Sequence, residues 1–591
     1  MCGIFGYVGC ETDTGEMVLH ALKRLEYRGY DSWGVAVGIN GRITIEKNVG
    51  KIGDARVDLP ASRIGFGHTR WATHGGVTVA NAHPLSNSSG RLAVIHNGII
   101  ENFRQLKESL VASGTEFVSE TDTEVVAHLA SQRLGGGTAP DQVRDAVASV
   151  FLDLRGLNAI IVMDQRTSTL TAVKNISPLA IGRGPRGVFV ASDVLAFAGH
   201  ADEVCYIDDF QVAQLSGTGV RLTDARSGDV AAANWQPIVL NEGVTELGTY
   251  PHFLLKEIHE QPAVIESIAR DQIDGVRELA ARIREAYGTF FLGCGTASYA
   301  ALTGNYLFSR IAQRHVNFVV GSEFNYQEHF LTDRSLVVAL SQSGETVDVI
   351  EPVLSAQKRG ASVAALVNVR GSTLDRVADF SLHLNAGPEQ CVLSTKAYTA
   401  KVALLLLTAH VLNGSEHVGR DLLWRAVDGM QLSLTPTFND RVREVAARVM
   451  DRSNMFVIGR GLSYPTALEA ALKIKEVSYI HAEGFAGGEL KHGVIALVET
   501  GTPCIVYSPL DETRSDILSG AMELKARGGL IIGISPENEE VFDIHLPIAN
   551  VGDASPLVMA PPAQLLGYQL AVMLGHDPDK PRNLAKSVTV K

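Results

Sequence analysis

The chain opens on Met1-Cys2-Gly3-Ile4-Phe5-Gly6, so removal of one residue would leave a cysteine at the N-terminus. A thiol and a free α-amine would then share one residue, with ordinary pKa values of about 8.5 and about 8. Near neutral pH such a residue carries its own nucleophile and its own proton acceptor. The stretch predicts a catalytic cysteine, but any protein can carry a cysteine at position 2, so the rest of the chain has to decide.

Length and composition describe a globular protein of several domains. The 591 residues exceed what one core usually supports and predict roughly three to four domains. Apolar residues make up 46% of the chain, which excludes a disordered protein. The net charge of −13 argues against nucleic acid or an anionic membrane as the main partner. The longest apolar run, residues 402–412, is about half of what a bilayer requires, and no signal-peptide pattern is present, so we expect a cytoplasmic protein.

The cysteines and histidines show no spacing typical of a disulfide framework or a metal site. The six cysteines are scattered without a CxxC pair, and no HExxH motif accompanies the histidines. We therefore expect neither a metal nor a cofactor.

Residues 2–237 read as one sheet-rich α+β domain. Short β-branched runs at 43–45, 92–95, 157–162 and 187–190 alternate with helical patterns at 15–25 and 123–133. A polar segment with glycines, residues 238–251, is typical of a linker.

Beyond the linker the pattern changes to strand, Gly/Ser loop and helix, and it occurs twice. Residues 290–295 resemble 455–461, and residues 335–341 resemble 502–508 at nearly the same distance along the chain. The repeat predicts two α/β doubly wound parallel-sheet domains, 252–430 and 431–575. A tail of residues 576–591, without helical period, is expected to lie across them.

Several polar residues of the first domain suit attack of a thiolate on a carboxamide. Asn97 and Gly98 follow an apolar strand and offer a side-chain amide and a backbone N–H to an oxyanion, although Asn-Gly is also a common hairpin turn. Arg70 matches an amino-acid carboxylate but could be a surface cation. Asp122 suits an ammonium group or, equally, a helix cap.

Taken together, these segments resemble the N-terminal-nucleophile glutamine amidotransferases, whose fold is of the αββα type. The resemblance rests on residues 2–6, 27–32, 68–74, 83–84, 96–98 and 119–123. It implies that Cys2 attacks the glutamine amide, that Asn97 and Gly98 form the oxyanion hole, and that glutamine is bound by Arg70, Trp71, Thr73, His74, His83 and Asp122. Trp33 departs from the small residue common at its position, and we expect it to alter packing only.

In the first α/β domain, residues 341–346 (SQSGET) lie between an apolar strand and a helix that begins near Val347. Hydroxyls and backbone N–H groups at a helix N-terminus form an anion site, although Ser and Thr also cap helices. The equivalent loop of the second copy, residues 508–513, contains Pro509 and Asp511. We therefore expect only the first copy to bind phosphate.

The second copy supplies acid–base groups. Glu469, Lys473 and Glu476 fall at i, i+4 and i+7 on one helix face, where the alternative is a solvated Glu–Lys ladder. Glu476 and His492 suit proton transfer and ring opening of a sugar, and Lys586 suits an imine with a ketone.

The whole chain resembles the glucosamine-6-phosphate synthases, which are isomerising glutamine:fructose-6-phosphate aminotransferases. The matching segments are 294–296, 341–346, 389–396, 469–492 and 583–590. The resemblance implies catalytic roles for Lys473, Glu476, His492 and Lys586, and a gate at Trp71 for ammonia moving between the sites. It implies sugar-phosphate binding by Thr296, Ser341, Gln342, Ser343, Thr346, Val392, Ser394 and Ala585. Ala297 replaces a serine common in relatives, and we expect Ser298 to take over its contact.

The implied reaction converts fructose 6-phosphate and L-glutamine to glucosamine 6-phosphate and glutamate, the first committed step of amino-sugar (UDP-N-acetylglucosamine) synthesis, in a homodimer. The alternatives are an amidophosphoribosyltransferase, a sugar-phosphate-binding regulatory protein and a fructosamine-6-phosphate deglycase. The isomerase repeat argues against the first, the lysine and glutamate set against the second, and the glutaminase set against the third.

Overall fold

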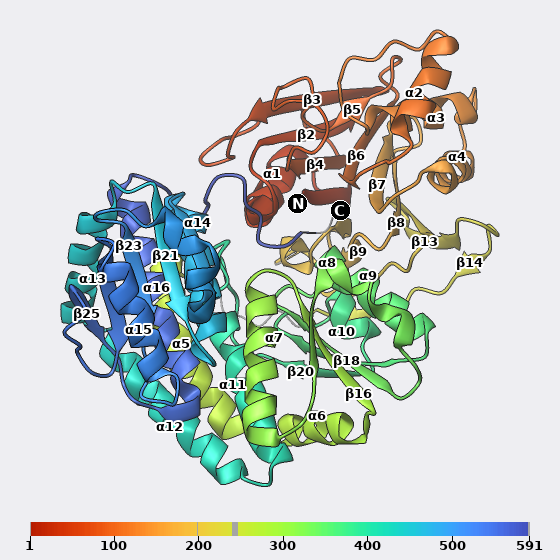
Figure 1. The fold of residues 1–591 in the computed structure, drawn as a ribbon. Coiled ribbons are helices and arrows are strands. Elements are labelled where there is room, and N and C mark those ends of the chain that lie inside the picture. The colour runs from red at the N-terminus through yellow and green to blue at the C-terminus, as the bar shows by residue number, and fades with distance from the viewer. Residues whose placement is uncertain (1, 198, 239–245, 589–591) are drawn as a thin grey trace. The chain divides into compact units, whose positions relative to one another are not determined.

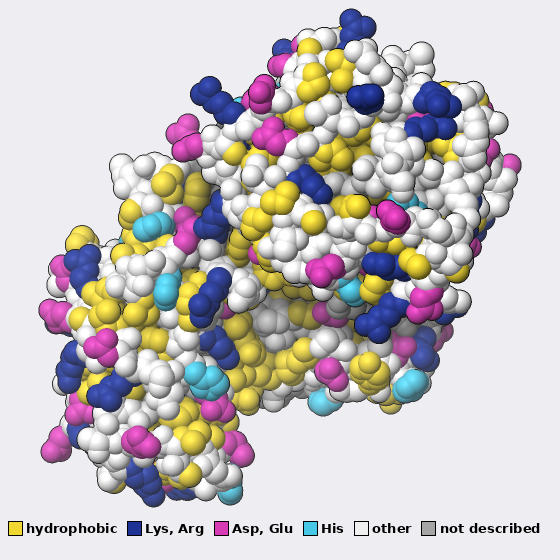
Figure 2. Space-filling view, turned by 90° about the horizontal axis from the view of Figure 1, so that it is seen from above, with side chains coloured by type: hydrophobic (Ala, Val, Ile, Leu, Met, Phe, Trp, Pro, Cys, Tyr) yellow, Lys and Arg dark blue, Asp and Glu magenta, His cyan; other side chains and the backbone are white. Residues whose placement is uncertain are grey.

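The computed structural model describes residues 2–197, 199–238 and 246–588, and they fall into two compact units (Figure 1). The first unit comprises residues 1–242 with 587–591, and the second comprises residues 243–586. Most of the linker expected at 238–251 lies outside the described residues. On the face shown in Figure 2, acidic and basic side chains are interspersed.

The first unit contains two antiparallel sheets. The first sheet has the order β15-β11-β9-β10-β1-β4-β2-β3 and the second has the order β14-β13-β12-β8-β7-β6-β5. The strands of the first are β1 (Gly3–Gly9), β2 (Ser32–Ile39), β3 (Arg42–Val49), β4 (Ile64–Arg70), β9 (Ala180–Gly184), β10 (Gly187–Ala191), β11 (Glu203–Tyr206) and β15 (Gln236–Pro237). Those of the second are β5 (Leu85–Ser86), β6 (Leu92–Gly98), β7 (Asn158–Asp164), β8 (Thr169–Asn175), β12 (Gln211–Ser216), β13 (Gly219–Asp224) and β14 (Val230–Ala231).

Alternation along these strands produces the αββα layers. On β1, Ile4 and Val8 face the second sheet, whereas Phe5 and Tyr7 pack with the residues of helix α1 (Thr14–Leu25). The outer face of the second sheet is covered by α3 (Glu124–Leu134) and α4 (Pro140–Asp153), and α2 (Phe103–Ala112) lies beside α3. The expected fold of this domain is confirmed. Trp33 is buried in the layer under α1.

The second unit contains two parallel five-stranded sheets. Their orders are β17-β16-β18-β19-β20 and β22-β21-β23-β24-β25. The strands are β16 (Gly288–Gly293), β17 (Asn317–Val320), β18 (Ser335–Ser341), β19 (Ser362–Val367), β20 (Phe380–His383), β21 (Asn454–Gly459), β22 (His481–Ala486), β23 (Pro503–Tyr507), β24 (Leu530–Ser535) and β25 (Ile544–Pro547). The two orders are the same, with β16 and β18 in the places of β21 and β23, which confirms two doubly wound domains.

A single apolar core joins both sheets of this unit. The helices that contribute to this core are α5 (Phe253–Asp271), α6 (Ile273–Glu285), α7 (Thr296–Leu307), α11 (Lys396–Leu412), α12 (Glu416–Ser433), α13 (Pro436–Val449), α14 (Ser463–Ser478) and α16 (Ser555–Met573). Four further helices each pack against one sheet: α8 (Gly321–Phe324), α9 (Val347–Lys358), α10 (Thr373–Val377) and α15 (Arg514–Lys525). The boundary expected after residue 430 falls inside α12, which packs against α5 and α16. Helix α11 is buried from Lys396 to His410, which explains the apolar run at 402–412. Among the described residues, no helix is both long and apolar enough to cross a membrane.

The tail after α16 crosses the second unit without regular structure. The Asp579 carboxylate accepts hydrogen bonds from the N–H groups of Phe253 and Leu254, and its carbonyl accepts one from Val392. The Arg582 guanidinium lies over the Tyr479 ring. These contacts hold the tail beside the loop that precedes α11.

Candidate active sites

Cys2 lies at the start of β1, partly exposed, beside the end of β4. The Trp71 N–H donates to its Sγ at 3.2 Å, and the N–H of Gly3 donates to Thr69 Oγ1 at 3.0 Å. A Cβ on Gly3 would lie 2.6 Å from Thr69 Oγ1, so glycine lets the two strands approach at this point.

The thiol of Cys2 has no side-chain base within hydrogen-bonding distance among the described residues. Burial raises its pKa, although the Trp71 N–H and the Arg70 charge lower it. Both hydrogen bonds of Sγ are to the backbone of Trp71. A group outside these side chains has to accept the thiol proton.

Asn97 and Gly98 end strand β6 next to Cys2. The Asn97 Nδ2 donates to the Cys2 carbonyl at 2.9 Å. Both residues pair with β7, opposite Ala159 and Asn158, so they do not form a hairpin turn. Gly98 has a φ of 131°, and a Cβ there would lie 2.0 Å from the Leu157 carbonyl.

Asp122 supports this strand end and does not cap helix α3. Its Oδ2 accepts the N–H of Ile100 at 2.8 Å, two residues beyond Gly98. The N-cap position of α3 belongs to Thr123, whose side chain makes no capping bond. The carboxylate therefore holds the backbone that follows the Asn97-Gly98 pair.

The remaining glutamine-site residues follow β4. Arg70 was expected to bind a carboxylate. In this structure its guanidinium donates to the carbonyls of His74, Gly75 and Gly76 and so holds the loop that follows β4. Thr73 is exposed, and the His74 ring packs edge-on against Phe103. The Trp71 ring packs edge-on against Tyr30.

His83, which was expected to bind glutamine, packs against another histidine. Its ring is buried and packs on the His68 ring at 4.4 Å between centroids, and neither nitrogen has a hydrogen-bond partner among the described residues. Burial lowers the pKa of His83 well below its usual value. The ring is placed to support His68.

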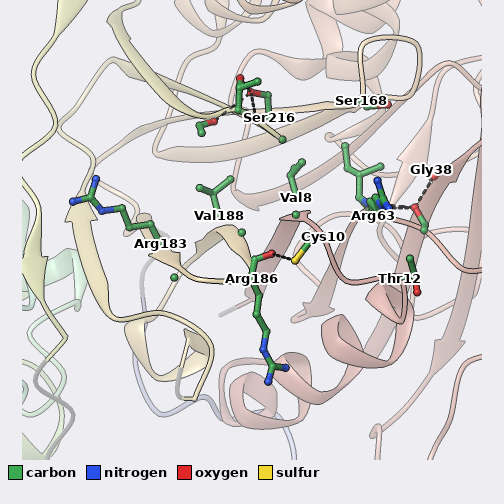
Figure 3. A pocket seen from close by; sticks show the side chains of 18 of the residues that line it. Val8, Cys10, Thr12, Gly38, Arg63, Ser168, Arg183, Arg186, Val188 and Ser216 are labelled. Atoms are coloured by element: carbon green, nitrogen blue, oxygen red, sulfur yellow. Dashed lines mark hydrogen bonds between the residues drawn. The ribbon is translucent and has the colours of Figure 1, made fainter.

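A cavity of about 1100 Å³ in the first unit is separate from this site (Figure 3). It is lined by residues at the far end of β1, among them Val8 and Cys10, and by Arg63, Arg183 and Arg186. Strand β1 (Gly3–Gly9) separates the cavity from Cys2, and at about 3.3 Å per residue its length corresponds to roughly 20 Å.

In the second unit, the loop between β18 and α9 is arranged to receive an anion. The Ser341 Oγ accepts the Gly344 N–H at 2.9 Å, which closes the loop on itself. Thr346 occupies the N-cap position of α9, but its side chain makes no capping bond. Gln342 Oε1 and Ser394 Oγ are buried without a hydrogen-bond partner in the described chain. Gly344 has a φ of 68°, which glycine adopts without strain.

The equivalent loop after β23 is filled by its own carboxylate. Asp511 Oδ1 accepts hydrogen bonds from both the N–H and the hydroxyl of Thr513. These donors are the ones that a phosphate would need, so the second loop is not arranged for an anion.

Lys473 lies at the centre of a buried charged cluster on α14. Its Nζ lies 2.7 Å from Glu476 and 3.5 Å from Glu469, and it donates to Thr296 Oγ1 at 2.8 Å. Lys473 and Glu469 are each 1% exposed, which excludes a solvated ladder. Burial raises the pKa of Glu469 to about 8, although Lys473 opposes the shift. Burial by itself would lower the pKa of Lys473, but the two carboxylates outweigh it and keep the ammonium charged.

Lys586 of the tail lies beside a second buried carboxylate. Its Nζ is 2.8 Å from Glu389 Oε2 and donates to the Leu393 carbonyl at 3.1 Å. Burial by itself would raise the pKa of Glu389, but the Lys586 charge outweighs it and holds the pKa at about 2. Glu389 also accepts the N–H groups of Thr395 and Ala397 at the start of α11.

Two residues expected to act on the sugar have other surroundings in the structure. His492 is exposed and makes no hydrogen bond or ion pair with any other described residue, Lys473 and Lys586 included. The Ser298 hydroxyl donates to the Gly295 carbonyl at 2.7 Å, so its proton is used at the start of α7.

The chain is similar to known proteins along its whole length. Residues 68–199 match the glutamine amidotransferase domain family, and residues 282–411 and 449–573 each match the SIS domain family. The glutamine–fructose-6-phosphate aminotransferases (isomerizing) of Thermococcus kodakarensis and Pyrococcus horikoshii are 41% and 40% identical to it, over 100% of both chains in each case. The chain belongs to this aminotransferase family.

A solved structure agrees with the second half. The C-terminal domain of the glucosamine-fructose-6-phosphate aminotransferase from Francisella tularensis is 32% identical with a TM-score of 0.54, and covers 57% of this chain and 99% of its own. For an aminotransferase of this family, the matched glutamine amidotransferase domain fits neither a regulatory sugar-phosphate-binding protein nor a deglycase.

Several residues of this aminotransferase were not singled out from the sequence. His68 and Glu389 lie inside segments that carry the resemblance, but no pattern gives them a task. Glu257 accepts the N–H groups of Gln390 and Cys391, and burial raises its pKa to about 8. Asp31 accepts the N–H of Ala72. The hydrogen-bond partner of each of these residues lies far away in the sequence, so a local pattern could not identify it.

Proposed function

We propose that Cys2, freed by removal of Met1, releases ammonia from L-glutamine and that the second unit uses it to make glucosamine 6-phosphate from fructose 6-phosphate. The supporting observation is the contact between Asn97 Nδ2 and the Cys2 carbonyl, which places an oxyanion donor beside the nucleophile. A cytoplasmic location, which fits six unbridged cysteines, belongs to the same proposal.

In the first half-reaction, Cys2 Sγ bonds to the amide carbon of glutamine. The Cys2 α-amine takes the thiol proton and passes it to the departing nitrogen, because no described side chain is placed to do so. Ammonia leaves, a thioester remains, and water then releases glutamate. Asn97 and Gly98 stabilise the oxyanion, while Arg70, Trp71, Thr73, His74, His83 and Asp122 form or support the glutamine site.

In the second half-reaction, the 341–346 loop holds the phosphate. Ser341, Gln342, Ser343 and Thr346 are the binding residues, and Thr296, Val392, Ser394 and Ala585 line the sugar. The Lys586 Nζ forms an imine with C2 and expels water; ammonia then displaces the lysine. Glu476 moves a proton from C1 to C2, and the Lys473 ammonium beside it stabilises the charge that develops. Trp71 gates the passage of ammonia between the sites.

The direct test supplies the protein with glutamine and fructose 6-phosphate. We expect equal amounts of glutamate and glucosamine 6-phosphate, measured by chromatography. Glutamate without hexosamine phosphate would contradict the assignment of the second unit, and neither product would contradict both halves.

We further propose a homodimer in which His492 opens the sugar ring in the partner's site. The exposed position of His492, without a hydrogen bond or ion pair to the described side chains of Lys473, Glu476 or Lys586, supports this arrangement. A C2 dimer would bring each His492 to the other copy.

This proposal predicts complementation between two inactive variants. His492→Ala and Lys586→Arg should each lose sugar conversion, and an equimolar mixture, refolded together, should regain about a quarter of wild-type activity, because about half of the dimers are mixed and each holds one intact site. Each variant refolded alone is the control. A mixture that forms mixed dimers but stays inactive would show that both residues act within one chain.

A further inference from the structure

We propose that His68 is a positioning residue that fixes the orientation of the Asn97 carboxamide, so that its N–H group and not its oxygen faces the oxyanion. This inference rests on the proposed role of Asn97. His68 belongs to β4 of the first sheet, opposite Ile4 of β1, whereas Asn97 belongs to β6 of the second sheet. The imidazole therefore links the sheet that carries the nucleophile to the strand of the oxyanion donor in the other sheet.

The hydrogen bonds of His68 define its tautomer. Its Nε2 lies 2.9 Å from the His96 carbonyl, which can only accept, so Nε2 carries the proton. The same Nε2 lies 3.2 Å from Asn97 Oδ1. Since this N–H donates, the atom of Asn97 that faces it has to be the oxygen.

The other end of the carboxamide confirms this orientation. Asn97 Nδ2 lies 2.9 Å from the Cys2 carbonyl, which again can only accept. Fixed partners on both sides thus leave one orientation. One hydrogen of the Nδ2 group is used by Cys2, and the second remains for the oxyanion that forms on the substrate bonded to Cys2 Sγ.

The surroundings keep His68 in this state. The ring is 0% exposed, its Nδ1 has no hydrogen-bond partner in the described part of the chain, and the His83 ring packs on it at 4.4 Å. Burial lowers the pKa of His68 to about 3, so the ring is neutral at pH values near neutrality. Without His68, the Asn97 oxygen would lose its hydrogen-bond donor. The carboxamide could then rotate and present either its oxygen or its NH₂ group to the substrate.

The first experiment measures glutamine hydrolysis by His68→Leu and His68→Gln. We expect His68→Leu to lower kcat by about 10- to 100-fold with KM within about 3-fold, a smaller loss than the 10²–10³-fold from deleting an oxyanion donor. His68→Gln keeps an N–H donor and should recover most of kcat. His128→Leu is the matched control, because that buried histidine contacts Glu124 and Phe117 and none of the Cys2 site.

The second experiment separates positioning from a structural role with a double-mutant cycle. In the Asn97→Ala background, His68→Leu should change kcat by less than about 2-fold, because the group it orients is gone. Equal losses in both backgrounds, or a change in KM alone, would overturn the proposal. The thermal unfolding transition of the first unit, measured by calorimetry, reports whether each variant is folded, because sugar conversion belongs to the second unit. Wild-type protein without glutaminase activity would instead contradict the proposed function.

Discussion

Replacing Cys2 with alanine should abolish glutamine hydrolysis and glutamine-dependent synthesis while synthesis from added ammonia continues. The substitution removes the only atom proposed to bond to the amide carbon, and loss of a nucleophile lowers kcat on the order of 10⁴-fold or more. The second unit has its own sheets and core, so its chemistry should be unaffected. Measuring glutamate and glucosamine 6-phosphate with each nitrogen donor checks both parts.

Cys10→Ala is the matched control for this prediction. Cys10 is an exposed thiol at the other end of β1, in contact with the Arg186 carbonyl, and should be dispensable. Loss of ammonia-dependent synthesis in Cys2→Ala would contradict the separation into two sites. The intact mass of the wild type is a further check, because a retained Met1 would block the proposed role of the α-amine.

The sequence was sufficient for features that depend on short segments. The strand before Asn97-Gly98, the 341–346 loop and the start of α9 at Val347 are all local, and the structure has them where the pattern predicts. The repeat also predicted two sheets of equal topology, because each copy contains the same alternation of strand and helix.

Features that depend on tertiary packing could not be predicted. Spacing puts Glu469, Lys473 and Glu476 on one face of a helix but does not tell a solvated face from a buried one. The face is buried against residues distant in sequence, such as Thr296, 177 residues away, whose hydroxyl accepts a hydrogen bond from Lys473. Similarly, the partners of Arg70 are loop carbonyls whose positions depend on the fold of residues 71–76.

The task of His68 illustrates the same limit. It lies in residues 68–74, which resemble the glutamine amidotransferases, yet its partner Asn97 is on another sheet, and only the packing of the two sheets brings them together. For His492 the reverse holds. The sequence motif indicates a role for it, but within one chain its side chain is exposed and forms no hydrogen bond with the described residues.

Replacing Lys586 with arginine should eliminate glucosamine 6-phosphate formation while glutamine hydrolysis stays within a few-fold of wild type. Arginine preserves the charge beside Glu389 but stays protonated, so it cannot form an imine. The expected loss is on the order of 10⁴-fold. A neutral substitute such as methionine would be less informative, since it would leave Glu389 as an unpaired buried charge and destabilise the tail.

Reduction with borohydride tests the imine directly. In the wild type, borohydride added with fructose 6-phosphate should fix the sugar phosphate on Lys586, visible as a mass increase of its peptide, and Lys586→Arg should show none. Lys475→Met is the control, because that exposed lysine lies on α14 next to the charged cluster. Arginine at position 586 with more than a small fraction of wild-type synthesis would mean that Lys586 acts only as a charge, and that ammonia attacks the ketone without a covalent intermediate.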